Sequence, residues 1–206
     1  MTGNSDLINV FKECGGLLEG HFGLTSGRHS PVYLQCAQIL QYPDIARRLG
    51  LQLADLARKT FCLSGEGDID TVISPAVGGI VIGQEVAAGL GSRAIFSERA
   101  DGKMVLRRGF GIREGERILA VEDVVTTGGS IRETVELALE CGGQVVGTAS
   151  IVHRYTEKPV NPTHLQHLAL LSIHAPAFEP SQCPMCLDGY PLEKPGSRHL
   201  SASTPL

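Results

Sequence analysis

The hydrophobic and polar positions of this chain change period along the sequence, and the changes predict strands that alternate with helices. Five short apolar runs suit buried strands, at residues 70–76, 93–98, 117–123, 144–154 and 168–175. Two segments between them, residues 78–91 and 130–143, suit helices. Strands and helices that alternate in this way are typical of right-handed β-α-β units, in which a parallel sheet carries helices on both faces.

The remaining segments have a less regular pattern. Asn4 or Ser5 is expected to cap a first helix, and residues 17–36 are expected to be extended. Pro43 suits the first turn of a second helix, where its missing N–H group costs nothing. Residues 99–116 are polar and punctuated by glycine, with a central apolar stretch that suits a hairpin.

The composition is that of a globular domain. With 206 residues, 42% of them hydrophobic and 19% charged, the chain is expected to form a single domain over residues 1–206 with a substantial core. The net charge of −4 argues against a nucleic-acid binder that depends on overall basicity. The tail after Pro176 is rich in proline, serine and glycine, and is expected to be ordered only in part.

The sequence also indicates a compartment. The first residues contain no basic segment followed by an apolar one, so no signal peptide is expected. No apolar run reaches the roughly 18 residues of a membrane span. The cysteines are scattered and mostly lie within apolar patterns, which is typical of reduced thiols in a cytoplasmic protein.

The segment with the most chemistry is the end of the apolar run at 117–123 and the turn that follows it. Residues 126–130, Thr-Thr-Gly-Gly-Ser, combine hydroxyl donors with glycines that allow close approach of an anion. The helix that begins here directs its free N–H groups and its positive dipole end to the same place. The turn is therefore expected to cradle a phosphate, and it differs from the P-loop because the Gly-Lys-Ser/Thr ending is missing.

Two adjacent acids, Glu122 and Asp123, stand just before this turn. Because carboxylates repel phosphate, they are expected to face another part of the ligand, either a sugar diol or a Mg²⁺ ion that bridges diol and phosphates. The ligand implied is a ribose with a phosphate at one end. The alternative is a strand that ends in two solvated acids and a plain glycine turn.

The arrangement from Ile118 to Ser130 resembles the binding motif of type I phosphoribosyltransferases, in which apolar residues, two acids and a Thr/Gly-rich turn follow one another. Three more segments resemble the orotate phosphoribosyltransferases of that family. Residues 20–36 resemble their N-terminal hood, residues 74–83 their pyrophosphate loop, and residues 96–110 their mobile catalytic loop. The resemblance covers most of residues 5–155.

This resemblance implies a parallel sheet flanked by helices, with a core at about 43–175 and a small hood formed by about 5–40 and the C-terminal tail. It implies the conversion of orotate and phosphoribosyl pyrophosphate into orotidine 5′-monophosphate and pyrophosphate, with Mg²⁺ held mainly by the substrate and not directly by the protein. It also implies a homodimer in which the loop of one subunit serves the neighbouring site. The residues expected to bind phosphoribosyl pyrophosphate are Glu122, Asp123, Val124, Val125, Thr126, Thr127, Gly128, Gly129, Ser130, Arg99 and Lys103.

The resemblance also assigns the base site. Arg154 offers a planar fork of donors for the orotate carboxylate or imide edge, and it follows Thr126 at the spacing that the family shows for its orotate contacts. Without the family match, a surface arginine paired with an acid is the alternative. Tyr33 and Leu34 are candidates to cover the orotate ring, with ordinary strand packing as an equal alternative.

Catalysis is assigned to Arg99, Lys103 and Asp123. Departing pyrophosphate develops negative charge, so Arg99 and Lys103 are expected to reach it when the loop closes and excludes water. Asp123, with Glu122, is expected to steady the positive charge of an oxocarbenium-like ribose. The alternative for Arg99 and Lys103 is a solvated basic loop; Arg107 and Arg108 are weaker candidates.

Some positions depart from the family pattern or stand outside it. Thr25 and Gly78 occupy positions where some branches of the family carry lysine, so those contacts are expected to be absent or supplied by backbone N–H groups. Cys183 and Cys186 have the spacing of half a zinc site, but the sequence shows no matching second pair, so no metal role is predicted for them.

Two other functions remain open at this point. One is a phosphoribosyltransferase that acts on a purine base, against which the hood segment and Arg154 argue. The other is a non-catalytic regulator that binds phosphoribosyl pyrophosphate as a signal. Such a regulator would keep the phosphate cradle and lose the loop, whereas this chain keeps Glu-Arg-Ala-Asp-Gly-Lys-Met at residues 98–104.

Overall fold

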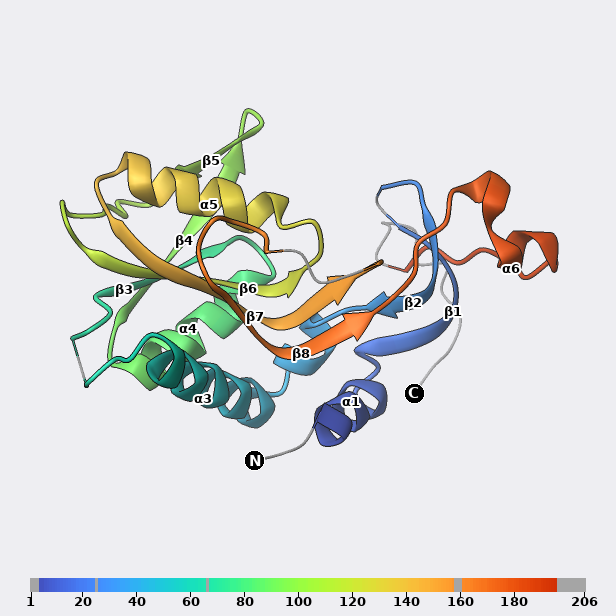
Figure 1. Cartoon of the computed structure of the whole chain (residues 1–206), viewed down its shortest axis with the longest axis horizontal. Helices are drawn as coiled ribbons and strands as arrows, with labels where there is room; N and C mark the ends of the chain where they lie inside the picture. The colour runs from blue at the N-terminus through green and yellow to red at the C-terminus, as the bar shows by residue number, and fades with distance from the viewer. Residues whose placement is uncertain (1–3, 25, 66, 158–160, 196–206) are drawn as a thin grey trace.

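A six-stranded sheet forms the centre of the computed structural model. The structure describes residues 4–24, 26–65, 67–157 and 161–195, and Figure 1 shows how the elements are arranged. The strand order is β5-β4-β3-β6-β7-β8. All neighbours run parallel except β4 and β5, which are antiparallel. The strands are β3 (Thr71–Pro75), β4 (Arg93–Ala100), β5 (Lys103–Leu106), β6 (Arg117–Val125), β7 (Gln144–Tyr155) and β8 (His167–His174).

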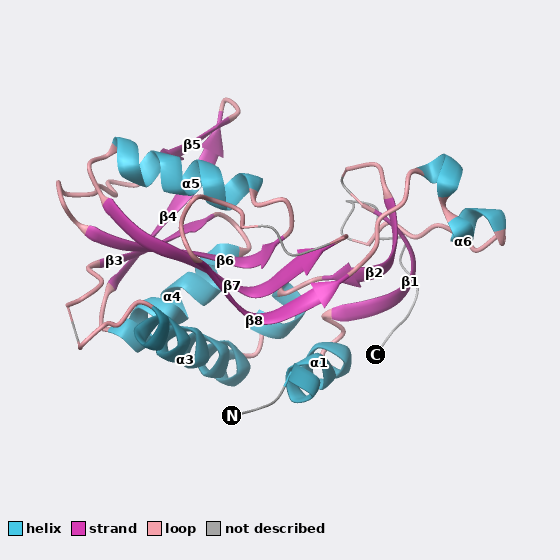
Figure 2. Cartoon of the chain, viewed as in Figure 1, coloured by secondary structure: helices cyan, strands magenta, loops and turns pink. Residues whose placement is uncertain are grey.

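Helices cover both faces of this sheet, as the alternating pattern predicts (Figure 2). On one face, α3 (Pro43–Thr60) and α4 (Gly79–Leu90) enclose the larger apolar core, in which Leu53, Ile82 and Leu119 are fully buried. On the other face, α5 (Gly129–Glu140) packs on a smaller core around Ile118 and Ile131. The fold class expected from the sequence, a sheet of parallel strands flanked by helices, is confirmed, with one antiparallel strand at its edge.

That antiparallel strand explains the hairpin expected within residues 99–116. The β4 strand continues to Ala100, and β5 returns from Lys103. The two turn residues, Asp101 and Gly102, have φ values of 49° and 81°. Positive φ at both central residues is the backbone of a type I′ turn, whose twist matches that of antiparallel strands.

A second, smaller sheet lies beside the main one. It pairs β1 (Leu17–Gly23) with β2 (His29–Leu34) in antiparallel fashion, after α1 (Asn4–Glu13) and before the short α2 (Ala37–Leu40). We call β1, β2 and residues 176–195 the hood. The tail in this hood contains the 3₁₀ turn η1 (Pro180–Gln182) and α6 (Pro184–Leu187).

The two segments of the hood are joined by backbone hydrogen bonds. His29 and Phe178 exchange two N–H to carbonyl bonds of 2.8 Å each, and Gly23 donates to the Glu193 carbonyl at 2.8 Å. The tail is thus ordered as far as residue 195 by its contacts with β1 and β2, and residues 196–206 lie outside the described residues. Among the described residues, no helix has the length and apolar character to span a membrane.

Candidate active site

The candidate site lies at the carboxyl edge of the parallel strands, where ligands of open α/β sheets bind. Strand β3 ends there in residues 76–78 and α4, and β6 ends there in the turn before α5. Val125 of β6 pairs with His153 of β7. The next residue along β6 is Thr126, which begins the turn, and the next along β7 is Arg154, which still pairs with Ile173 of β8. Thr126 and Arg154 therefore lie near the same edge of the sheet.

The turn after β6 is held in a fixed shape. Gly128 has a φ of +75°, and a Cβ atom at this position would lie 2.2 Å from the Cβ of Pro162. The Arg132 guanidinium donates to the Pro162 carbonyl at 3.0 Å and to the Thr127 carbonyl at 3.3 Å. These contacts anchor the turn from behind, while Thr126 and Thr127 stay exposed in front of the helix. The first N–H groups of α5 have no partner within the helix and can bind an anion.

The two acids are half-buried at the end of β6. Burial, followed by the charge of Asp123, raises the pKa of Glu122 to about 8. Burial also raises the pKa of Asp123, although its backbone hydrogen bonds oppose this. A hydroxyl donor or a cation stabilises the ionised form of such a carboxyl pair. This pair therefore suits a diol or a substrate-bound metal ion.

Gly78 lies directly against this pair. A Cβ atom on Gly78 would be 2.7 Å from both carboxylate oxygens of Asp123. A lysine at this position, as in some branches of the family, would require the Asp123 carboxylate to move. With glycine at position 78, the Asp123 carboxylate occupies the space that a side chain at this position would need. Thr25, the other departure, lies outside the described residues.

Arg154 connects the sheet to the hood. Its side chain is buried to 9% exposure, and Nη2 donates to Oγ of Ser30 at 3.1 Å. Oγ of Ser30 in turn donates to the Pro176 carbonyl at 2.8 Å. Burial, followed by the charge of Arg28, lowers the pKa of Arg154. Two neighbouring guanidinium groups make this region attractive to an anion such as a carboxylate.

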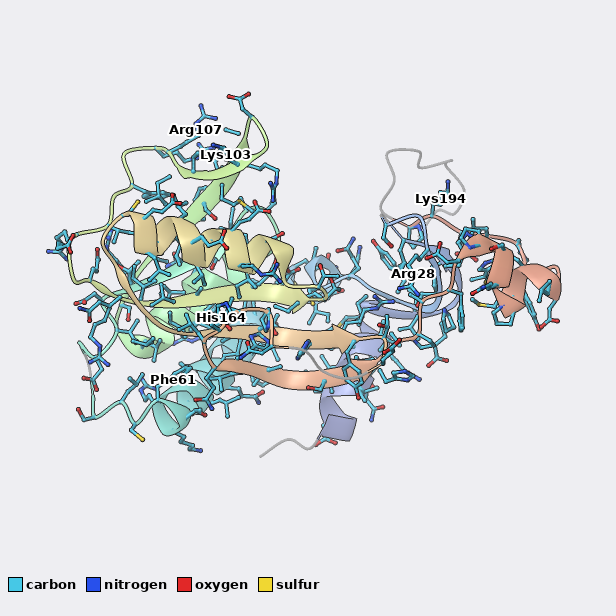
Figure 3. The ribbon with its side chains drawn as sticks, turned by 45° about the horizontal axis from the view of Figure 1, so that its top comes forward. Arg28, Phe61, Lys103, Arg107, His164 and Lys194 are labelled. Atoms are coloured by element: carbon cyan, nitrogen blue, oxygen red, sulfur yellow. The ribbon has the colours of Figure 1, made fainter. Side chains whose placement is uncertain are left out.

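The candidate loop residues lie on the β4–β5 hairpin, and Figure 3 shows Lys103 and Arg107 on this projecting part of the molecule. Arg99 donates to the Gly102 carbonyl at 2.8 Å and forms a 2.8 Å ion pair with Glu133 of α5. Lys103 is exposed at the start of β5. Arg108, the weaker candidate, is engaged with Glu98 through two bonds of 2.9 and 3.0 Å.

Tyr33 and Leu34 both make packing contacts. The Tyr33 ring lies 5.8 Å from that of Phe22, centroid to centroid. Leu34 packs against the larger core. These are the contacts expected from the strand-packing alternative, and a role in covering the orotate ring stays a prediction.

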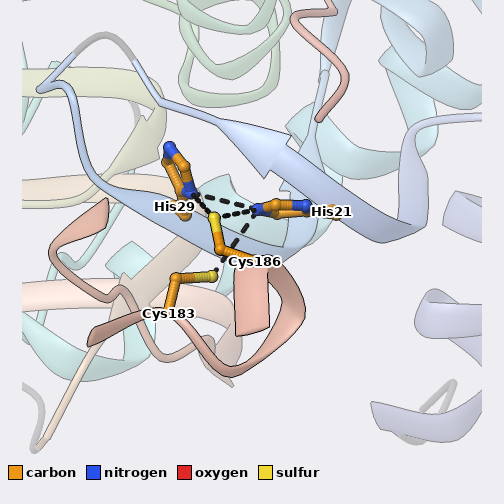
Figure 4. Close-up of side chains that lie close together, drawn as sticks. All are labelled: His21, His29, Cys183 and Cys186. Carbon is orange, nitrogen blue, oxygen red and sulfur yellow. Dashed lines mark hydrogen bonds between the residues drawn. The ribbon is translucent and has the colours of Figure 1, made fainter. Parts of the chain in front are cut away.

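Sequence reasoning missed several residues of the site because their partners are distant in the chain. Ser30 and Arg132 carry no signal of their own, and each is recognised only by the bond it makes. For Cys183 and Cys186, the expectation that no second pair of ligands exists is wrong. His21 and His29, eight positions apart on adjacent strands, meet the cysteine pair in space (Figure 4).

The comparisons with known proteins agree with this geometry. Residues 38–164 match the family model described as the phosphoribosyl transferase domain. An orotate phosphoribosyltransferase of Caldicellulosiruptor bescii is 48% identical over 191 residues, which covers 93% of this chain and 96% of the relative. One from Chlorobium phaeobacteroides is 44% identical and covers 93% of this chain and 95% of the relative.

Solved structures show the same fold. The orotate phosphoribosyltransferase of Aeropyrum pernix superimposes with a TM-score of 0.61 at 25% identity, covering 81% of this chain and 93% of that one. A phosphoribosyltransferase of Corynebacterium diphtheriae gives a TM-score of 0.64 at 22% identity, covering 84% of this chain and 96% of that one, and supports the fold alone. With a family model that matches more than half of its residues and relatives of this identity over nearly its whole length, the chain belongs to the orotate phosphoribosyltransferase family.

Proposed function

We propose that this protein transfers the ribose 5-phosphate group from phosphoribosyl pyrophosphate to orotate. The products are orotidine 5′-monophosphate and pyrophosphate, and the reaction serves the synthesis of UMP. The observation that carries the proposal is the register of β6 and β7, which brings the phosphate turn at Thr126 and the buried Arg154 to one edge of the sheet. The chain thus offers a sugar-phosphate site and an anion site side by side.

The sugar donor occupies the turn after β6. Its 5-phosphate accepts hydrogen bonds from the N–H groups and hydroxyls of residues 126–130, and its diol donates to Glu122 and Asp123. With a pKa of about 8, Glu122 has a disfavoured ionised form in the chain without ligand, and the hydroxyl donors of a bound diol would favour that form. The acids also oppose the positive charge that forms on the ribose.

Orotate occupies the space beside Arg154. The guanidinium can present two parallel donors to a carboxylate, which fixes the orientation of a flat base more firmly than a single ammonium group does. The ring nitrogen of orotate then attacks C1 of the ribose as the bond to pyrophosphate breaks. Because orotate is already an anion, no strong protein base is required.

Departing pyrophosphate is assigned to the β4–β5 hairpin. The ion pair of Arg99 with Glu133 is exposed on both sides, and exposed pairs contribute only about 0–1 kcal/mol. Arg99 can therefore exchange Glu133 for pyrophosphate when the hairpin closes, and Lys103 is free to follow from the same turn. Mg²⁺, held by the substrate beside the two acids, would supply further neutralisation of the pyrophosphate charge.

We also propose a cytoplasmic homodimer in which the hairpin of one subunit serves the site of the other. The free cysteines of the chain support a reducing compartment. The projection of Lys103 at the hairpin tip supports a role away from its own hood (Figure 3). The dimer is tested by mixing Lys103→Ala with Arg154→Ala subunits. Sharing predicts that mixed dimers regain activity, because one site then contains both native residues.

The reaction itself is tested by following the ultraviolet absorbance of orotate in the presence of phosphoribosyl pyrophosphate and Mg²⁺. Turnover with orotate and none with adenine, guanine or hypoxanthine is the expected result. Turnover with a purine alone would support the purine-specific alternative. Binding of the sugar donor without turnover on any base would support a non-catalytic regulator.

A further inference from the structure

Four side chains with metal-binding atoms converge inside the hood, away from the proposed catalytic residues (Figure 4). His21 comes from β1 and His29 from β2, while Cys183 and Cys186 come from the tail. Their ligand atoms all lie within 4.8 Å of one another. The segments that meet here are more than 150 positions apart in the chain, with 162 positions between His21 and Cys183.

The distances within this cluster suit a tetrahedral ion. Nε2 of His21 lies 3.0 Å from Nδ1 of His29, 3.5 Å from Sγ of Cys183 and 3.6 Å from Sγ of Cys186. Sγ of Cys186 lies 3.2 Å from Nδ1 of His29. Zinc bonds of about 2.0–2.1 Å to nitrogen and about 2.3 Å to sulfur, at tetrahedral angles, separate neighbouring ligand atoms by roughly 3.3–3.8 Å. The two distances from His21 to sulfur, 3.5 and 3.6 Å, lie in this range, and the distances of 3.0 and 3.2 Å to Nδ1 of His29 lie just below it. Small shifts of these side chains would bring the four atoms around one ion.

The local structure orients the ligands. Cys183 precedes α6, and the N–H of Cys186 donates to the Cys183 carbonyl at 3.1 Å, so this helical turn directs both thiols to one side. Nδ1 of His21 lies 2.9 Å from the Tyr190 carbonyl, which can only accept a hydrogen bond. The proton of a neutral His21 therefore sits on Nδ1, and the lone pair of Nε2 faces the cluster. A backbone carbonyl in this position is the usual outer partner of a metal-bound histidine.

The cluster is also closed in the manner of a structural site. His21, His29 and Cys183 are buried, at 4%, 8% and 0% exposure, and Cys186, the fourth ligand, is exposed. We propose that these four residues form a Cys₂His₂ site for Zn²⁺, which fastens the C-terminal tail to the β1–β2 hairpin. Two soft thiolates and two imidazoles at tetrahedral spacing favour zinc over the oxygen-seeking Mg²⁺. Binding releases the two thiol protons to solvent.

The zinc content of the full-length protein tests this proposal. Protein purified without a histidine tag, incubated with Zn²⁺ and desalted is expected to retain about one zinc per chain by mass spectrometry of the metal. Replacement by Co²⁺ is expected to give the visible bands of a tetrahedral ion and a thiolate-to-cobalt charge-transfer band. Cobalt spectra without the thiolate band, or protein without retained metal, would overturn the proposal.

Variants separate this site from the other thiols of the chain. Cys183→Ser and Cys186→Ser are expected to lose stoichiometric zinc, whereas Cys62→Ser, an exposed cysteine elsewhere in the chain, is expected to retain it. Circular dichroism shows whether each variant is folded. If a variant is not folded, the cobalt spectrum of the native chain is the measurement that tests the site. A Cys183–Cys186 disulfide, detected as two missing thiols in denatured protein kept without reductant, together with failure to bind zinc after reduction, would contradict the site.

Discussion

Arg154 and Ser30 are joined by a hydrogen bond of 3.1 Å from Nη2 to Oγ, although 124 positions separate them in the chain. The bond connects the end of β7 with β2, and through the Pro176 carbonyl it reaches the C-terminal tail. The proposed orotate site is therefore bounded by a core strand on one side and by the hood on the other. Changes at either side are expected to affect the base more than the sugar donor.

Arg154→Ala removes the donors proposed for orotate. Hydrogen bonds to charged groups contribute about 1.5–3 kcal/mol, which corresponds to a factor of about 10–100 in affinity. The KM for orotate is expected to rise by that factor, while the KM for phosphoribosyl pyrophosphate changes little. Steady-state kinetics with each substrate varied in turn measures both. Ser30→Ala, which keeps the Arg154 guanidinium, is expected to raise the KM for orotate by less than Arg154→Ala does. If Arg154→Ala raised both KM values equally, Arg154 would not belong to the base site.

Lys103→Ala tests the hairpin. Because Lys103 is exposed and lies outside both cores, its loss is expected to leave the midpoint of thermal unfolding unchanged. Loss of a cation that acts on departing pyrophosphate is expected to lower kcat by about 100- to 1,000-fold. Lys59→Ala, an exposed lysine at the end of α3, is the matched control and is expected to be fully active. An unchanged kcat in Lys103→Ala would place catalysis elsewhere.

Glu122→Gln tests the protonation of the acid pair. The folded state raises the pKa of Glu122 from 4.5 to about 8, so the native acid lowers stability as the pH rises through this interval. Glutamine does not ionise, and the variant is expected to exceed the native chain in unfolding free energy by roughly 2–4 kcal/mol near neutral pH, since each pKa unit corresponds to about 1.4 kcal/mol. Urea unfolding at a series of pH values measures the difference.

Well below pH 4.5, where the carboxyl group is protonated in both the folded and the unfolded state, this gain is expected to vanish. A constant difference at every pH would mean that packing, and not ionisation, distinguishes the two side chains. The variant is also expected to need more phosphoribosyl pyrophosphate, because the diol donors of the ligand favour the ionised form of Glu122, and a carboxylate accepts hydrogen bonds more strongly than the neutral amide of glutamine does.

Gly128→Ala tests the shape of the phosphate turn. A side chain at φ +75°, with its Cβ 2.2 Å from that of Pro162, is expected to destabilise the chain by about 1–3 kcal/mol and to raise the KM for phosphoribosyl pyrophosphate. Gly129→Ala is the control for stability, since an added Cβ there meets nothing within 4 Å and its φ is not positive. Equal stability of the two variants would show that the turn adapts to a side chain.

The strands and helices of the core were predictable because each is marked by a local period of apolar residues. The turn after β6 was recognisable for the same reason, since Glu122, Asp123 and residues 126–130 are consecutive. The antiparallel return of β5 followed from the turn residues Asp101 and Gly102 only once the pairing of β4 was known. Local chemistry thus sufficed to single out the turn to which we assign the phosphate.

The base side and the hood depend on contacts between distant segments, which no local period records. The Arg154–Ser30 bond is one example. The cluster of His21 and His29 with the cysteine pair is another example. The two histidines are eight positions apart in the sequence, and the pairing of β1 with β2 brings their side chains together. The contact of Gly78 with Asp123 likewise exists only after β3 and β6 are placed side by side.

Removal of the proposed zinc tests whether the metal site of the hood supports the hydrogen bond between Ser30 and Arg154. His29, a proposed ligand, is followed directly by Ser30, the partner of Arg154. A chelator with strong preference for zinc, added with Mg²⁺ in excess, is expected to lower the midpoint of thermal unfolding and to raise the KM for orotate more than that for phosphoribosyl pyrophosphate. The reason is that loss of the ion frees the tail and the strand that carries Ser30. Cys186→Ser is expected to show both changes without chelator and no further change with it. A chelator effect of the same size in Cys186→Ser would assign the response to another metal.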